Sequence, residues 1–76
     1  MNFGEALEAM KKGERCYRLG WNGDGVYVFL HSSEPNLPIV SHVLKHFVLF
    51  TADKDFQPGW APSQSDLLLD DWEVVK

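Results

Sequence analysis

The chain has 76 residues, 45% of them hydrophobic, three tryptophans and a formal net charge of −4 at pH 7. This composition excludes a disordered chain, because disorder needs low hydrophobicity and high charge. The negative charge, with no basic block, argues against long nucleic acid as a partner.

The length predicts one domain over residues 1–76 with a thin core, since a chain this short buries only about 60–65% of its unfolded surface. A single cysteine, Cys16, excludes an internal disulfide. A metal or self-association would then supply the missing stability. No apolar run approaches the roughly 18 residues needed to span a bilayer. No membrane contact and a cytoplasmic location are therefore expected.

The N-terminal segment predicts a helix over 3–12. Asn2 is placed to cap its first turn, and Gly13 to end it. Its apolar residues recur at helical spacing, as Phe3, Ala6, Leu7 and Met10.

The centre of the chain predicts strands joined by turns. Residues 15–19 and 26–30 form a hairpin around the glycine-rich stretch "LGWNGDG", which is expected to turn tightly. A strand at 47–51 turns through 52–55 into a weaker strand at 56–60.

The remaining segments are a loop, a short helix and a last strand. Residues 32–38 are rich in proline and serine and predict a loop, whereas 39–45 fit either a strand or a helical turn. Ser63 with Asp66 resembles a capping box that opens a short helix, and 72–75 predict a strand. The expected fold class is α+β, a small antiparallel β-sheet packed on an N-terminal α-helix, with a short second helix near the C-terminus.

Two of the predicted strands are apolar at every position. A sheet with one wet face alternates apolar and polar residues, but 26–30 and 47–50 do not. Both sheet faces should therefore be covered, and one helix cannot cover both. We expect a second copy of the chain to pack on the other face, giving a homo-oligomer.

A metal site is not expected. His42 and His46 have the spacing that places two imidazoles on one helix face, with His31 as a possible third ligand. The metalloprotease pattern needs a glutamate beside the first histidine, and position 43 is Val. Solvent-facing or interface histidines fit the sequence better.

No catalytic constellation is predicted either. Cys16 lies near Arg15 and Arg18, which would lower a thiol pKa, but a small core residue is the favoured interpretation. Ser63 and Ser65 lack a nucleophile context. Asp70 and Asp71 suit a solvated turn. No cofactor and no enzymatic turnover are expected.

The remaining candidates are aromatic and polar. Flat rings beside turn amides stack on a base, and amide side chains pair with its edge. The start of the helix at Ser63 adds N–H groups that suit a phosphate. Trp21 has two interpretations, a core residue beside a turn or a flat platform for a ligand.

Three motifs resemble a known family. "GWNG", "TAD" and "GWAPSQSDLLLDDW" occur in the order found in a small phage and bacterial family associated with Thoeris anti-defence, and the matching segments cover about the first 30 and the last 30 residues. The middle, 32–46, looks shortened and divergent, so ligand preference can differ there.

The resemblance implies a homotetrameric sponge without turnover. Members of this family sequester a cyclic ADP-ribose-type signal, and some also hold cyclic dinucleotides, so that the immune effector is never switched on. This implication moves Trp21 toward the ligand interpretation. The ligand-binding residues expected are Trp21, Asn22, Gly23, Tyr27, Thr51, Trp60, Ser63, Gln64 and Asp66. A nucleotide-cleaving enzyme and a protein–protein module that inhibits a defence protein directly are the alternatives.

Overall fold

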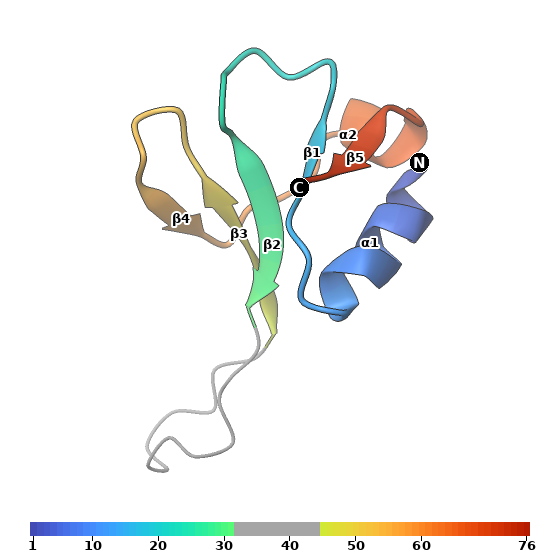
Figure 1. The fold of residues 1–76 in the computed structure, drawn as a ribbon, viewed down its shortest axis with the longest axis horizontal. Coiled ribbons are helices and arrows are strands. Elements are labelled where there is room, and N and C mark those ends of the chain that lie inside the picture. Colours follow the sequence, from blue (N-terminus) through green and yellow to red (C-terminus); the bar gives the residue numbers. More distant parts are fainter. Residues whose placement is uncertain (32–44) are drawn as a thin grey trace, which may run out of the picture.

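The computed structural model describes residues 1–31 and 45–76. The predicted loop at 32–38, nearly all of the ambiguous segment 39–45, and His42 lie outside the described residues. Two helices and a five-stranded antiparallel sheet in the order β4-β3-β2-β1-β5 make up the described part (Figure 1). The predicted α+β class is confirmed.

The N-terminal helix α1 (Phe3–Lys11) forms as the sequence predicts. The Asn2 side chain accepts a hydrogen bond from the Glu5 N–H at 2.8 Å, and Glu5 Oε1 accepts from the Asn2 N–H at 3.0 Å, which completes a capping box. Gly13 ends the helix at φ +93°, a left-handed conformation that glycine adopts without steric cost.

Each predicted strand is present. The strands predicted at 15–19, 56–60 and 72–75 are shorter than expected, and those predicted at 26–30 and 47–51 keep their length but are shifted by one residue. They are β1 (Cys16–Arg18), β2 (Tyr27–His31), β3 (His46–Phe50), β4 (Phe56–Pro58) and β5 (Trp72–Val74). β2 and β3 pair over five residues, from Tyr27 opposite Phe50 to His31 opposite His46. The final strand pairs with β1, so it closes the far edge of the sheet.

The expected tight turn in the first hairpin is wrong. β1 and β2 are paired at Cys16 and Val28, and the chain between them forms a wide loop rather than a two-residue turn at Asn22-Gly23. Gly25 takes the left-handed conformation, at φ +79°. The strands separate because residues from the C-terminal segment bind the start of this loop, as described below.

Helix α2 (Gln64–Leu68) is also confirmed. The Ser63 hydroxyl accepts from the Asp66 N–H at 3.1 Å, and Asp66 Oδ2 accepts from the Ser63 N–H at 2.8 Å. The predicted capping box therefore forms with aspartate in place of the usual glutamate.

The core lies between α1 and one face of the sheet, which we call the covered face. It consists of Ala6, Met10, Cys16, Val28 and Trp72, all essentially inaccessible to solvent. Cys16 is thus a core residue, as expected, and burial raises the pKa of its thiol.

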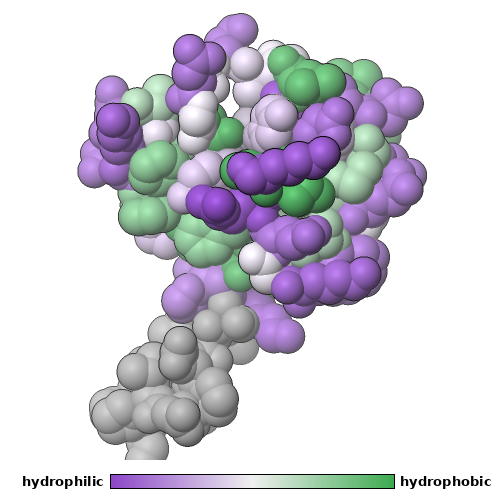
Figure 2. All heavy atoms as spheres, viewed as in Figure 1, coloured by the Kyte–Doolittle hydropathy of each residue, from purple (hydrophilic) through white to green (hydrophobic). Residues whose placement is uncertain are grey.

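The opposite face of the sheet, which we call the aromatic face, has no helix of the described residues packed on it. Tyr27 stacks on Phe50 with ring centroids 4.9 Å apart, and Phe50 contacts Phe56 at 5.0 Å. Phe56 is 61% exposed. Figure 2 shows hydrophobic residues reaching the surface on the side where Figure 1 places β3 and β4. The strands are therefore apolar on both faces of the sheet, but a described helix packs on only one of them.

Candidate functional site

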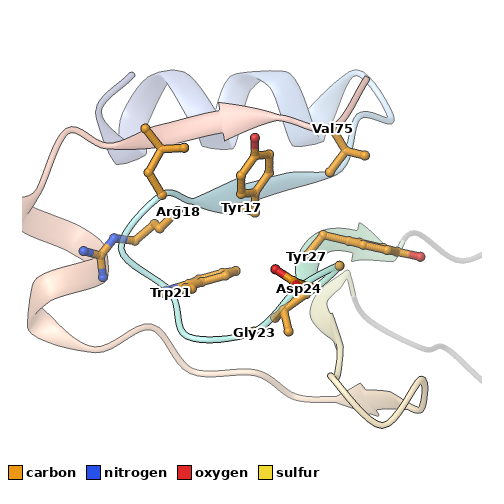
Figure 3. A pocket seen from close by; sticks show the side chains of 10 residues that line it. Tyr17, Arg18, Trp21, Gly23, Asp24, Tyr27 and Val75 are labelled. Atoms are coloured by element: carbon orange, nitrogen blue, oxygen red, sulfur yellow. The ribbon is translucent and has the colours of Figure 1, made fainter.

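A cleft opens where β1 and β2 separate, and we call it the Trp21 cleft (Figure 3). Its volume is about 400 Å³, within the range of roughly 300–1,000 Å³ typical of small-molecule sites. The walls come from β1, the loop that follows it, the start of β2 and the segment after β5. The lining residues are Tyr17, Arg18, Leu19, Trp21, Gly23, Asp24, Gly25, Val26, Tyr27 and Val75.

Trp21 is half-buried and is fixed from behind. Its indole Nε1 donates to Asp66 Oδ1 at 3.0 Å. Its ring meets Trp72 edge to face, with centroids 5.3 Å apart, and Trp60 at 6.0 Å. Offset and edge-to-face ring pairs add about 0.5–1.5 kcal/mol beyond area burial. Trp21 therefore belongs to the core on one side and to the cleft wall on the other.

Asp66 organises this region from inside the protein. It is 6% exposed, and its Oδ1 accepts from both Trp21 and Arg18 Nη1, the latter at 2.8 Å, while Oδ2 accepts from the Ser63 N–H. Burial opposes its ionisation, but the hydrogen bonds from Arg18, Ser63 and Trp21 prevail and lower its pKa. The geometry gives Asp66 a supporting role behind the cleft.

Arg18 bridges two carboxylates of the C-terminal segment. Besides Asp66, its Nε and Nη2 donate to the two oxygens of Asp71 at 2.7 and 3.2 Å. Asp71 also accepts from the Gly20 N–H at 3.0 Å, and its backbone carbonyl accepts from the Leu19 N–H. The bonds to Arg18 and Gly20 lower the Asp71 pKa, and the carboxylates raise that of Arg18.

The prediction that Asp71 lies in a solvated turn is therefore wrong. The adjacent residues Asp70 and Asp71 suggested a turn exposed to solvent. Asp71 instead points toward the protein, because it is the second counterion of the buried Arg18. Its bonds to residues 18–20 hold the start of the loop away from a tight hairpin.

A second, smaller hollow of about 270 Å³ lies beside the same loop and includes Trp21, Asn22 and Trp60 among its walls. Asn22 thus lies next to Trp21 but does not line the Trp21 cleft. Gly23 lies in the cleft wall, and a Cβ there would approach Val26 Cγ2 to 2.9 Å. A side chain at 23 would therefore require the Val26 side chain or the loop to shift.

Three of the expected ligand residues lie away from both hollows. Thr51 closes the β3–β4 turn, since its N–H donates to the Asp55 carbonyl and its Oγ1 accepts from the Asp55 N–H. The Ser63 hydroxyl and N–H are both used in the cap of α2. Gln64 is exposed. The Ser63 and Asp66 N–H groups are bonded within this cap, so these two groups are not available for the phosphate that the sequence suggested at the start of α2.

Sequence reasoning missed Tyr17, Asp24 and Val75. Asp24 belongs to the quoted "LGWNGDG" stretch and could have been selected as its single ionisable side chain. Tyr17 and Val75 are brought to the cleft by the pairing of β5 with β1, which the sequence does not reveal.

Within 1–31 and 45–76, no group of three or more His, Cys, Asp or Glu side chains could hold a metal ion. His31 faces His46 across β2 and β3, with ring centroids 5.1 Å apart. The helices in these ranges are too short and too polar to cross a membrane.

Comparisons of the sequence with a family profile and with a characterised protein point to the same family. Residues 1–75 match the sequence profile of the Thoeris anti-defense 2-like domain. Thoeris anti-defense 2 of Bacillus phage SP01 is 38% identical to this chain over 88 aligned positions, which cover 99% of this chain and 94% of the phage protein. The alignment is longer than this chain, so the phage protein carries inserted residues.

Proposed function

The chain belongs to the Thoeris anti-defense 2-like family, and we propose that it is a non-catalytic sponge for a cyclic nucleotide immune signal. Membership of this family supports an anti-defence role. The proposed ligands are cyclic ADP-ribose isomers, with cyclic dinucleotides as a second class. The protein would act in the cytoplasm of the infected bacterium and lower the free concentration of the signal.

The observation that carries this proposal is the anchored indole in the wall of the Trp21 cleft. A ring that is already held in place avoids the cost of ordering a free side chain on binding, about 0.5–1.5 kcal/mol. Asp66 holds the Trp21 N–H, and Trp72 supports the ring. A base stacked on an aromatic ring contributes about 1–3 kcal/mol.

The composition of the cleft supports binding rather than turnover. The residues that line it include no histidine, cysteine or serine, so the described walls offer no activated nucleophile beside a base. Arg18 is fully engaged with two carboxylates. Asp24 is the single carboxylate among the residues that line the cleft, and one carboxylate does not form the pair that glycosidic hydrolysis uses.

The aromatic face supports self-association, and we propose a homotetramer. Val48 is buried on this face, whereas Phe56 is largely exposed. Their neighbours Phe29 and Pro58 line a shallow hollow with them. A second copy that covers this surface would bury aromatic area worth roughly 25 cal/mol per Å², which the thin core of a single chain lacks.

Calorimetric titration with a panel of cyclic ADP-ribose isomers and cyclic dinucleotides tests the sponge. We expect tight binding of at least one compound, and its recovery unchanged by mass spectrometry after the complex is heated. Recovery of a cleaved product would show an enzyme instead. Trp21→Ala should weaken binding about tenfold to a hundredfold, from the loss of about 1–3 kcal/mol of stacking.

A protein–protein module is the second candidate. Besides Phe56, the leucines at 67–69 are exposed, and exposed apolar side chains favour partner binding. If this candidate is right, a purified defence protein will bind in the absence of any nucleotide, and none of the cyclic nucleotides in the panel will compete.

A further inference from the structure

The two arginines of the chain have opposite environments. Arg18 is buried and bonded to Asp66 and Asp71. Arg15 is exposed, and its guanidinium lies over the Tyr27 ring, 5.0 Å from the centroid. Within the described residues, Arg15 is in no ion pair. It is therefore a cation that is held in place by a ring and still able to bind an anion.

Arg15 lies at one margin of the Trp21 cleft. Tyr27, whose ring it covers, lines the cleft, and so does Val75, whose N–H donates to the Arg15 carbonyl at 2.8 Å. Lys76 lies near the same margin but shares its surroundings with Glu73. Arg15 is therefore the better-placed cation at this end.

Asp24 is exposed, and it lies in the wall of the cleft. Figure 3 shows it pointing into the space between Trp21 and Tyr27. A carboxylate in such a position accepts hydrogen bonds from hydroxyl groups and repels phosphate. The one other charged group in the described wall, Arg18, is already neutralised by its two aspartates.

We propose that Arg15 binds the phosphate of the nucleotide and that Asp24 accepts hydrogen bonds from its ribose hydroxyls, so that the ligand enters the Trp21 cleft in one orientation. This inference rests on the proposed function and assigns two binding residues to the same site. Arginine suits the phosphate because its planar donors bind two oxygens at once. The base then lies against Trp21.

Titrations at two salt concentrations test the Arg15 half. The probe is the cyclic ADP-ribose isomer that wild-type protein binds most tightly, measured at 50 and 300 mM NaCl. An Arg15–phosphate contact is exposed and therefore screened by salt. Arg15→Gln should weaken binding about tenfold at low salt, the loss of roughly 1.4 kcal/mol, and remove most of the salt dependence.

Two further variants serve as controls. Lys12→Gln removes the same charge from an exposed position at the end of α1 and should leave affinity within about twofold, since it acts only through the screened overall field. Arg15→Lys keeps the charge, so its salt dependence should persist. An Arg15→Gln protein with normal melting that binds like Lys12→Gln overturns the assignment.

The sign of the effect at Asp24 tests the orientation. Asp24→Asn should weaken binding about fivefold, because a charged acceptor for a hydroxyl becomes neutral. If the phosphate instead faced Asp24, removing the charge would strengthen binding, which would refute the orientation. Asp70→Asn, exposed and outside the cleft, is the matched control. Failure of wild-type protein to bind any isomer at either salt concentration would overturn the proposed function as well.

Discussion

The two faces of the sheet carry similar residues but have different surroundings. On the covered face, Val28 and Leu49 lie opposite each other beneath α1. On the aromatic face, Tyr27 and Phe50 are paired in the same strands, yet no described helix lies over them. The strands therefore specify more apolar surface than the described chain buries.

This difference separates two kinds of stability. Interactions on the covered face lie within one chain, so their loss lowers the free energy of unfolding at every protein concentration. If a second copy covers the aromatic face, its contribution grows with protein concentration. Substitutions on the two faces should therefore differ in whether dilution changes their effect.

The largest effect is expected at Trp72, on the covered face. It is 0% exposed, and its Nε1 donates to the Asp66 carbonyl at 2.8 Å. Trp72→Ala should lower the free energy of unfolding by about 3–5 kcal/mol. Urea unfolding at two protein concentrations should give the same loss. A loss that shrinks on dilution would show that Trp72 acts through association instead.

A loss of about 3 kcal/mol is expected from Arg18→Met, because it leaves two carboxylates, one of them buried, without their cation. Arg15→Met is the matched control and should cost well under about 1 kcal/mol, as usual for exposed positions. Equal losses in the two variants would contradict the contrast between these arginines.

The Arg18 network also predicts a pH dependence. The pKa values of Asp66 and Asp71 are lowered in the folded protein. Their contribution is therefore complete above the unfolded carboxyl pKa of about 3.9 and is lost as the pH falls through the lower folded values. Wild-type protein should lose stability on acidification below about pH 4, and Arg18→Met should lose less. Identical acid profiles would exclude a stabilising role for the network.

On the aromatic face, Phe56→Glu should change assembly more than folding. Phe56 is largely exposed in one chain, so the charge costs little there. If Phe56 packs against a second copy, the substitution would remove the roughly 1.5–3 kcal/mol per protomer that burial of the phenyl ring contributes to association. Light scattering should show wild-type oligomer and a smaller species for the variant. A wild-type monomer at micromolar concentration would refute the proposed assembly.

Much of the fold could be predicted because its signals are local. Asn2 and Ser63 cap helices through residues three positions away. The runs at 26–30 and 47–51 consist of residues with high β-propensity, and they predict β2 and β3. The pairing of β5 with β1 could not be predicted, since it joins residues more than 50 positions apart. The ends of β1 and β5 were misplaced for the same reason.

The site was predictable in part. Trp21 could be selected from the sequence because a large indole beside a glycine-rich turn is unusual. The role of Asp66 was not predictable, because its partners Arg18 and Trp21 are distant in sequence. The capping pattern at Ser63 suggested only a helix start, whereas the structure shows that the same carboxylate also anchors the indole.

The smallest effect, and the sharpest comparison, concerns the two sides of Trp21. Trp21→Phe keeps a flat ring but removes the N–H that Asp66 accepts. Losing a hydrogen bond to a charged group should cost about 1–3 kcal/mol of stability, while a remaining ring preserves part of the stacking. We therefore expect Trp21→Phe to show a clear drop in melting temperature with only a few-fold loss of affinity, whereas Trp21→Ala should lose both thermal stability and affinity.

Measuring melting and nucleotide affinity on the same samples separates the structural role of Trp21 from its binding role, because a purely structural Trp21 would leave the affinity of the folded fraction unchanged in both variants. Equal affinity losses for Trp21→Phe and Trp21→Ala would instead show that the anchoring bond, rather than the ring, determines binding.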